Sequence, residues 1–314
     1  MHRKKTKLAA RAHRLGTAIE RRGIAATYEL HDRLLSNRAS RRKFAHGRPE
    51  LDSVQRSIVD ALGREGYASV PFTELVADET LRQQIEEQAH RFTTETEHAL
   101  ASDGEGLRRR AGKEFVVRLH SYDGNIALDD PWFRACSSHR MLDVANAYLG
   151  LWSKLEYLDV WYSIPQAVSS ERKASQRWHR DYNDRHLLKA FLYLVDVDEE
   201  TGPFEYVAGS ARGGPYADDW PWRPLSESYP PADELAQRIP AEAIKTFTAP
   251  KGTIIFCNTS GFHRGGYATG TRPRVMAVYN YSSPASLAAL TLRNFDTDLA
   301  REGLSEQAAF ALTD

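Results

Sequence analysis

Five short runs of β-branched and aromatic residues restrict the possible folds of this chain more than any other feature. They are EFVVRLHSY at 114–122, LEYLDVWYSI at 155–164, LLKAFLYLVDV at 187–197, GTIIFCN at 252–258 and RVMAVYNYS at 274–282. Each run has the length of a strand and is bounded by Gly, Pro, Asn or Ser. Because no long helical patterns alternate with them, we predict an antiparallel sandwich or barrel of the jelly-roll type rather than a parallel doubly wound sheet.

Two helices are predicted ahead of most of these strands. The first lies in residues 51–66, where Asp52 or Ser53 can cap the helix and Gly66 can end it. The second covers about 78–100. The fold class that follows is mainly β with flanking helices (α+β), with the helices N-terminal to the β core.

Residues 1–50 are strongly basic, with 14 Lys and Arg against 4 Asp and Glu, although the whole chain has a net charge of zero. Basic and apolar residues recur at roughly helical spacing between residues 8 and 24, which predicts a basic helical extension. Such an arm can dock on nucleic acid, on an anionic membrane surface or on the acidic remainder of the chain. A solvated extension is the simpler interpretation, and no nucleic-acid partner is expected.

The cysteines and the hydropathy of the chain indicate a cytoplasmic protein. Cys136 and Cys257 are far apart, so neither a disulfide framework nor a thiolate zinc site is predicted. No run of about 18 apolar residues is present, and the N-terminal residues lack the apolar segment of a secretory signal. Residues 210–245 contain six prolines and little periodicity, and a connection of this length is typical of a lid or of a surface insertion.

The segment RWHRDYNDRH places His179 and Asp181 two positions apart, after a residue that suits a strand. Residues i and i+2 of a strand face the same side, so an imidazole and a carboxylate are presented together. These are two of the three ligands of the 2-His-1-carboxylate triad that binds Fe(II). Asp184 and His186 are the second choice for this role.

A second segment, KGTIIFCNTSGFHRGGYATGTRPRVMAVYNY, supplies a strand, His263, a Gly-rich turn and then Arg272 and Arg274 at the start of another strand. A hairpin here would bring an arginine close to the histidine. The guanidinium offers a fixed fork of donors that suits the distal carboxylate of a dicarboxylic acid. The two segments together point to a metal site with a carboxylate-binding arginine.

These segments resemble the phytanoyl-CoA dioxygenase family of Fe(II) and 2-oxoglutarate dependent oxygenases, over roughly residues 55–285. The features that carry the resemblance are WHRD with His179 and Asp181, ETGPFEYVAGS at 200–210, His263, and Arg274 eleven residues later. Ala208 and Ala211 stand where the family usually has Pro and His, and neither position holds a metal ligand in the family.

The resemblance implies a double-stranded β-helix (jelly-roll, cupin-like) core within an oxygenase domain over 51–314. It implies that the metal ligands are His179, Asp181 and His263. It also implies that Arg274, selected over Arg272 by the family spacing, binds the co-substrate 2-oxoglutarate. Lys189 falls near a family position that makes a polar contact to 2-oxoglutarate.

Several other side chains are candidates for the substrate pocket, each with an equally good structural explanation. Tyr162, Trp178 and Tyr182 suit either a pocket wall or the aromatic core. Trp220 and Trp222 can stack on a ring, and Arg118 or His120 can meet an anionic group.

The expected activity is hydroxylation, or a related oxidation, of a C–H bond in a small polar metabolite, with dioxygen consumed and 2-oxoglutarate decarboxylated to succinate and CO₂. Halogenating members of the family replace the carboxylate at the position of Asp181, so its presence implies oxidation. Two alternatives stay open: a cupin-like metal oxygenase or isomerase that does not use 2-oxoglutarate, and a non-catalytic binding protein recruited by its basic arm.

Overall fold

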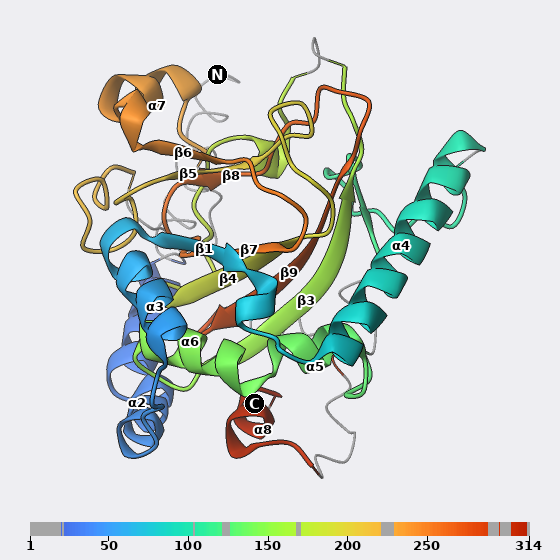
Figure 1. Ribbon diagram of the computed structural model, residues 1–314. Coiled ribbons are helices and arrows are strands. Elements are labelled where there is room, and N and C mark those ends of the chain that lie inside the picture. Colours follow the sequence, from blue (N-terminus) through green and yellow to red (C-terminus); the bar gives the residue numbers. More distant parts are fainter. Residues whose placement is uncertain are drawn as a thin grey trace, which may run out of the picture.

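The computed structural model describes residues 20, 22–102, 104–120, 126–167, 171–220, 229–287, 295 and 303–312. Two antiparallel sheets lie face to face (Figure 1). The larger sheet has six strands in the order β1 (Tyr67–Pro71), β7 (Thr253–Cys257), β4 (Leu187–Tyr193), β9 (Arg274–Ser282), β3 (Lys154–Ser163) and β2 (Val116–Arg118). The smaller has the order β6 (Ile244–Phe247), β5 (Phe204–Val207) and β8 (His263–Arg264). The predicted mainly β, jelly-roll fold with flanking helices is confirmed.

Helices cover the outer face of the larger sheet (Figure 1). Their bounds are α2 Ser36–His46, α3 Ser53–Glu65, α4 Glu79–Ala101, α5 Pro131–Cys136, α6 His139–Leu149 and α8 Glu306–Leu312, and a further helical segment covers 22–33. The remaining helix, α7 (Ala232–Arg238), lies beside the smaller sheet (Figure 1). The three-residue 3₁₀ turns are η1 Phe72–Glu74, η2 Ala174–Gln176 and η3 Ala241–Ala243.

The two predicted helices are α3 and α4, and α3 begins and ends where its predicted capping residues lie. Asp52 accepts a hydrogen bond from the backbone N–H of Gln55, whose side chain in turn accepts from the Asp52 backbone N–H, so α3 begins with a capping box. Gly66 ends α3 with φ 85°, a left-handed conformation that favours glycine. Asp78 caps α4 through the backbone N–H of Leu81.

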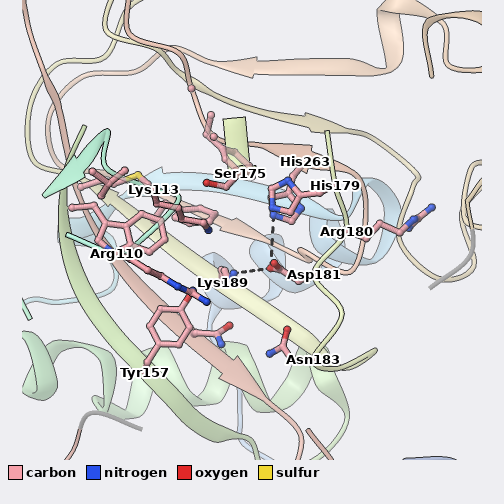
Figure 2. Close-up of a pocket in the computed structure, with 18 of the residues that line it drawn as sticks. Arg110, Lys113, Tyr157, Ser175, His179, Arg180, Asp181, Asn183, Lys189 and His263 are labelled. Carbon is pink, nitrogen blue, oxygen red and sulfur yellow. Dashed lines mark hydrogen bonds and ion pairs between the residues drawn. The ribbon is translucent and has the colours of Figure 1, made fainter. Parts of the chain in front are cut away.

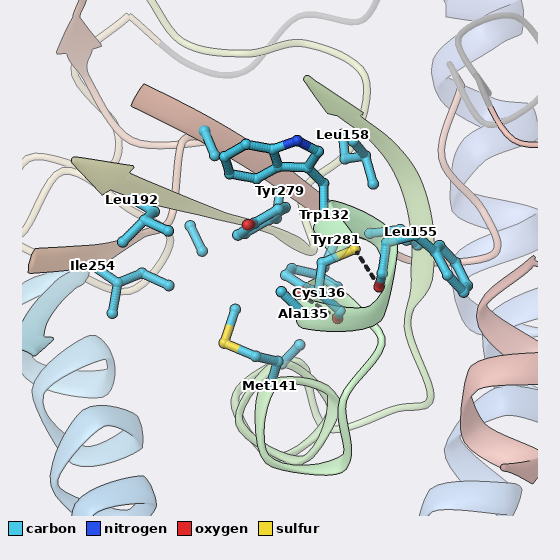
Figure 3. Packing of buried hydrophobic residues seen from close by; sticks show 14 of the residues in the cluster. Trp132, Ala135, Cys136, Met141, Leu155, Leu158, Leu192, Ile254, Tyr279 and Tyr281 are labelled. Atoms are coloured by element: carbon cyan, nitrogen blue, oxygen red, sulfur yellow. Dashed lines mark hydrogen bonds between the residues drawn. The ribbon is translucent and has the colours of Figure 1, made fainter. Parts of the chain in front are cut away.

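Strand alternation divides the buried apolar residues between two layers. One layer packs between the larger sheet and the helices; there Trp132 of α5 and Met141 of α6 lie against Tyr279 and Tyr281 of β9 (Figure 3). The other layer fills the space between the two sheets and includes Phe204 of β5. The residues on this second face of the larger sheet are therefore the ones that can line a cavity between the sheets.

Part of the basic N-terminal segment is docked on the body of the protein. Tyr28 is buried, and its hydroxyl donates to Asp184 Oδ1 over 2.5 Å. Asp32 Oδ1 lies 3.1 Å from Nε2 of His186. Residues 184–186 lead into β4, so the segment braces the connection between the WHRD motif and the larger sheet. None of the described helices has the length and hydrophobicity needed to span a bilayer.

Candidate metal centre

The backbones of His179 and His263 pair directly. Each residue donates its N–H to the carbonyl oxygen of the other over 3.0 Å, which forms an isolated antiparallel bridge. Side chains of directly paired residues point to the same side. The two imidazole centroids are consequently 4.2 Å apart. Two residues further on, the N–H of Asp181 donates to the carbonyl of Thr259 over 2.9 Å, so the next position is held by the same neighbouring segment.

These three side chains converge on one point. One ligand atom from each of His179, Asp181 and His263 lies within 4.8 Å of the other two. The Nδ1 atom of His179 is 2.8 Å from the carbonyl oxygen of Arg177, and that of His263 is 3.0 Å from the carbonyl oxygen of Gly261. A proton on each Nδ1 satisfies these carbonyls and leaves each Nε2 lone pair available to a metal.

The surroundings keep the three groups in the protonation states that bind metals. Burial lowers the pKa of His179 to about 3 and that of His263 to about 4, so both imidazoles are neutral near pH 7. Burial alone would raise the pKa of Asp181, but the ammonium of Lys189 opposes this through its charge and its hydrogen bond, and the pKa lies below its ordinary value, so the group is a carboxylate. Neutral imidazole and carboxylate are the forms that coordinate a divalent cation.

Lys189 of β4 faces this carboxylate rather than open space. Its Nζ atom is 2.6 Å from Asp181 Oδ2 (Figure 2). The carboxylate raises the pKa of Lys189 above its ordinary value against the opposing effect of burial. The sequence predicts a contact between Lys189 and 2-oxoglutarate, and the structure places its ammonium on Asp181, one of the three candidate ligands, at the cavity wall. It fixes the orientation of Asp181 and offsets part of its charge.

Arg274 is buried at the start of β9, on the cavity side of the larger sheet. Its Nη1 donates to the carbonyl of Gly202 over 2.5 Å, and its Nε has no hydrogen-bond partner among the described residues. A Cβ at Gly266 would come within 2.6 Å of the same guanidinium, so only glycine leaves room there. Arg272 lies outside the cavity, where it is exposed and pairs with Asp198.

The cavity between the sheets has a volume of about 160 Å³. It contains the three candidate ligands, Lys189, Arg274 and Tyr182, all of which were singled out in the sequence. Further lining residues that the sequence did not reveal as site residues are Arg110, Lys113, Glu156, Tyr157, Asn183, Tyr229 and Asn280. Burial and the nearby Lys189 lower the pKa of Lys113 to about 8, because several cations surround the same space.

Arg180, between the two ligands of the WHRD motif, points away from the cavity (Figure 2). It is buried against the ring of Phe262, with its guanidinium carbon 3.9 Å from the ring centroid. Its guanidinium donates hydrogen bonds to five carbonyl oxygens, those of Ser210, Tyr216, Ala217, Asp219 and Ser260. The first part of the proline-rich segment is thus hydrogen-bonded to the segment that carries two of the candidate ligands, His179 and Asp181.

Two predicted pocket residues lie elsewhere. Tyr162 packs in the layer between the larger sheet and the helices, since the alternation of β3 turns it away from the cavity. Trp178 is buried with Phe262, Leu235 and Ile239, which places it in a small core beneath α7. Both are core aromatics rather than parts of a pocket wall.

The weaker candidates also have structural partners. Asp184 and His186 bind the N-terminal segment, and Arg118 pairs with Asp159 at 3.3 Å. Trp220 contacts the ring of Phe262, with the centroids 5.7 Å apart. Trp222 lies outside the described residues.

The chain matches the model of a known protein family. The family model for phytanoyl-CoA dioxygenase (PhyH) matches residues 63–276, which is more than half of the chain and contains all three candidate ligands and Arg274. Comparison with curated protein sequences gives no match.

Similar solved structures include the epimerase SnoN in complex with Fe³⁺, alpha ketoglutarate and nogalamycin RO, at 20% identity and a TM-score of 0.49, covering 81% of this chain and 93% of that one. EctD from S. alaskensis with 2-oxoglutarate and 5-hydroxyectoine is 18% identical with a TM-score of 0.47, covering 75% and 77%. AviO1 from Streptomyces viridochromogenes Tue57 is 18% identical with a TM-score of 0.49, covering 76% and 98%.

Proposed function

Because this chain belongs to the phytanoyl-CoA dioxygenase family of non-haem iron and 2-oxoglutarate dependent enzymes, we propose that it oxidises, most simply hydroxylates, a C–H bond of a small polar metabolite. The observation that carries the proposal is the convergence of His179, Asp181 and His263 within 4.8 Å inside a cavity that also contains Arg274. Dioxygen is the oxidant, and 2-oxoglutarate is the co-substrate that is decarboxylated to succinate and CO₂.

The donor set fits iron(II). Two neutral imidazoles and one carboxylate on one side of a metal form the facial triad of non-haem iron oxygenases and leave further coordination positions open. Hydrogen bonds from each Nδ1 to a backbone carbonyl fix the ring orientation before a metal binds. When bound, the metal and 2-oxoglutarate supply the oxidising chemistry, and the protein supplies the geometry and an enclosed space.

Arg274 is the residue that we assign to the distal carboxylate of 2-oxoglutarate. Its guanidinium is buried, has a free Nε among the described residues, and is held by the Gly202 carbonyl beside a glycine that leaves space. A dicarboxylate would offset the positive charge that Arg274 and Lys113 place in the cavity. Lys113 is available to a second carboxylate oxygen, whereas Lys189 is occupied by Asp181.

Asp181 bears on the outcome of the reaction. Because the carboxylate occupies the third ligand position, the site has no place for a halide ligand at that point, which supports oxidation rather than halogenation. The remaining choice among hydroxylation, desaturation, epimerisation and ring closure depends on the substrate.

The chain also suits a reducing compartment. Cys136 and Cys257 are both free and buried, as a cytoplasmic protein permits. We propose that the basic segment before α3 acts as a structural extension of the domain over 51–314, because the contacts of Tyr28 and Asp32 are made to that domain.

Two measurements test the function. Anaerobic addition of iron(II) and then 2-oxoglutarate should give a visible charge-transfer band, and addition of dioxygen should release succinate. His179→Ala should lose at least about 100-fold in succinate release while keeping the circular dichroism spectrum of the wild type. Bound iron with no band and no succinate would favour an oxygenase or isomerase that does not use 2-oxoglutarate.

A further inference from the structure

The cavity wall contains a polar recess that the iron and 2-oxoglutarate assignments do not use. Asn280 lies six residues after Arg274 on β9, on the same face of the strand, which puts the two positions roughly 20 Å apart. In register, Asn280 pairs with Tyr157 of β3 on one side and with Lys189 of β4 on the other. All four of these residues line the cavity.

The amide of Asn280 is fully buried and unsatisfied. Its exposed fraction is 0%, and neither Nδ2 nor Oδ1 has a hydrogen-bond partner among the described residues. A buried amide without partners costs about 1–3 kcal/mol per unsatisfied group. Asn280 is therefore a poor choice for the stability of the fold and a suitable one for a ligand group that enters the cavity.

Two neighbouring side chains complete the recess. Glu156 is fully buried at a β-bulge of β3. Asn183, two residues after Asp181, donates to both carboxylate oxygens of Glu156 over 2.8 and 3.0 Å, and Ser286 donates to one of them over 3.0 Å. The carboxyl group is thus held in place at the cavity wall by neutral donors.

The neighbours of Asn280 limit what can bind. Tyr157 on one side is neutral, and the charge of Lys189 on the other side is offset by Asp181, 2.6 Å away, so neither neighbour favours a charged ligand group. The amide itself offers two N–H donors and one acceptor oxygen. The complementary partner is a neutral group that presents a donor and an acceptor side by side.

We propose that Asn280, with Glu156 and Asn183, forms a substrate subsite for a neutral donor–acceptor pair, either vicinal hydroxyls of a polyol or sugar-like ring or a primary carboxamide. The aromatic residues Tyr157 and Tyr229 line the same cavity and offer the apolar contact that a ring requires. This inference rests on the proposed function, because it assigns part of the substrate to the same cavity.

The test compares Asn280→Leu with Asn146→Leu. Asn146 is also buried, but its Oδ1 accepts hydrogen bonds from the backbone and the hydroxyl of Ser153 at 2.7 and 2.8 Å. Asn146→Leu should therefore lower the melting temperature. Asn280→Leu should leave it unchanged or raise it, because the substitution removes two unsatisfied polar atoms. A clear fall in the melting temperature of Asn280→Leu would show a structural role and overturn the proposal.

Binding is measured with two probes, methyl β-D-glucopyranoside for the hydroxyl class and propionamide for the carboxamide class. Each is titrated by saturation-transfer NMR into protein loaded with nickel(II) and 2-oxoglutarate. We expect the wild type to bind one probe, and Asn280→Leu to bind it at least about 10-fold more weakly, as the loss of two hydrogen bonds predicts. Equal binding by the two proteins, or no binding of either probe by the wild type, would contradict the subsite. The charge-transfer band of the wild type tests the proposed function separately, because it requires only the metal and 2-oxoglutarate and no substrate.

Discussion

Arg180 and Asp181 are adjacent in the chain and direct their side chains in opposite directions, that of Arg180 to five backbone carbonyls and that of Asp181 to the candidate metal centre. Four of the five hydrogen bonds of Arg180 go to residues 210–219, the first part of the segment that the sequence suggested as a lid, and the fifth goes to Ser260. A movement of residues 210–219 would therefore displace the backbone of His179 and Asp181, which flank Arg180.

Replacing Arg180 by Met should destabilise the protein strongly. The substitution leaves several buried carbonyls without donors, and we expect the free energy of unfolding to fall by about 3–5 kcal/mol. Urea unfolding measures the loss, and limited proteolysis should show faster cleavage within residues 211–219. Arg212→Met, at an exposed position in the same segment, is the control and should behave as the wild type. Unchanged stability of Arg180→Met would mean that the segment is held by other contacts.

Replacing Lys189 by Met should separate its two assigned roles. Without the ammonium 2.6 Å away, the buried carboxylate of Asp181 has lost its main cation, so the metal-free protein should lose about 3–5 kcal/mol of stability. Nickel(II) then supplies the missing positive charge, and its stabilising effect on the melting temperature should be larger in the variant than in the wild type.

The control is Lys245→Met, at a strand lysine of β6 outside the cavity. A Lys189→Met variant with normal stability that needs a higher concentration of 2-oxoglutarate for half-maximal succinate release would instead support direct contact between Lys189 and the co-substrate.

Replacing Glu156 by Gln should change how stability depends on pH. Burial raises the pKa of Glu156 to about 7 from an ordinary value of 4.5. Between these pH values the folded state binds more protons at this position than the unfolded chain does, so this group lowers stability as the pH rises. Gln does not titrate. The stability of the variant relative to the wild type should therefore rise between pH 4.5 and 7, by at most about 1.4 kcal/mol per pH unit.

Urea unfolding of the metal-free proteins at several pH values measures this difference. Glu87→Gln, at an exposed position of α4, should give a flat difference over the same range. A flat difference for Glu156→Gln as well would show that its carboxyl group titrates normally.

Replacing Gly266 by Ala should displace the guanidinium of Arg274 from its position beside the Gly202 carbonyl. The added Cβ would lie 1.5 Å from the carbonyl oxygen of Gly202 and 2.6 Å from the guanidinium, so one of them must move. We expect at least about a 10-fold weaker affinity for 2-oxoglutarate, with a stability loss of about 1–3 kcal/mol from overpacking. Anaerobic titration of the charge-transfer band measures the affinity. Gly63→Ala, where an added Cβ meets nothing within 4 Å, should leave it unchanged.

Two of the three candidate ligands, His179 and Asp181, could be expected to lie together from the sequence because their signal is local. Alternation in a strand puts His179 and Asp181 on one side whatever the rest of the fold does. The position of His263 opposite His179 is a non-local pairing, and only the resemblance to a family indicated it.

The polar cavity wall was harder to see. Asn280 has even spacing from Arg274 within RVMAVYNYS, so the information that both face one side was present. Strand residues, however, do not reveal which face lines a cavity. The same uncertainty about which face lines the cavity explains why Tyr162 was a wrong candidate for the pocket wall. Tyr162 lies an odd number of residues from Tyr157 on β3, so the two side chains face opposite layers. The bulge at Glu156 shifts the register of β3 and cannot be read from composition.

The docked N-terminal segment suggests that the polypeptide can be divided without losing the fold. Tyr28 and Asn37 are buried against residues that follow in the chain by more than 150 positions, whereas residues 47–49 between α2 and α3 are exposed or only partly covered. A chain cut at Gly47 should yield two fragments that recombine when mixed. The contacts that Tyr28 and Asn37 make with the rest of the protein do not depend on the covalent link at Gly47. Complementation of this kind would show that the N-terminal extension can be removed and added back as a support for the segment that contains His179 and Asp181.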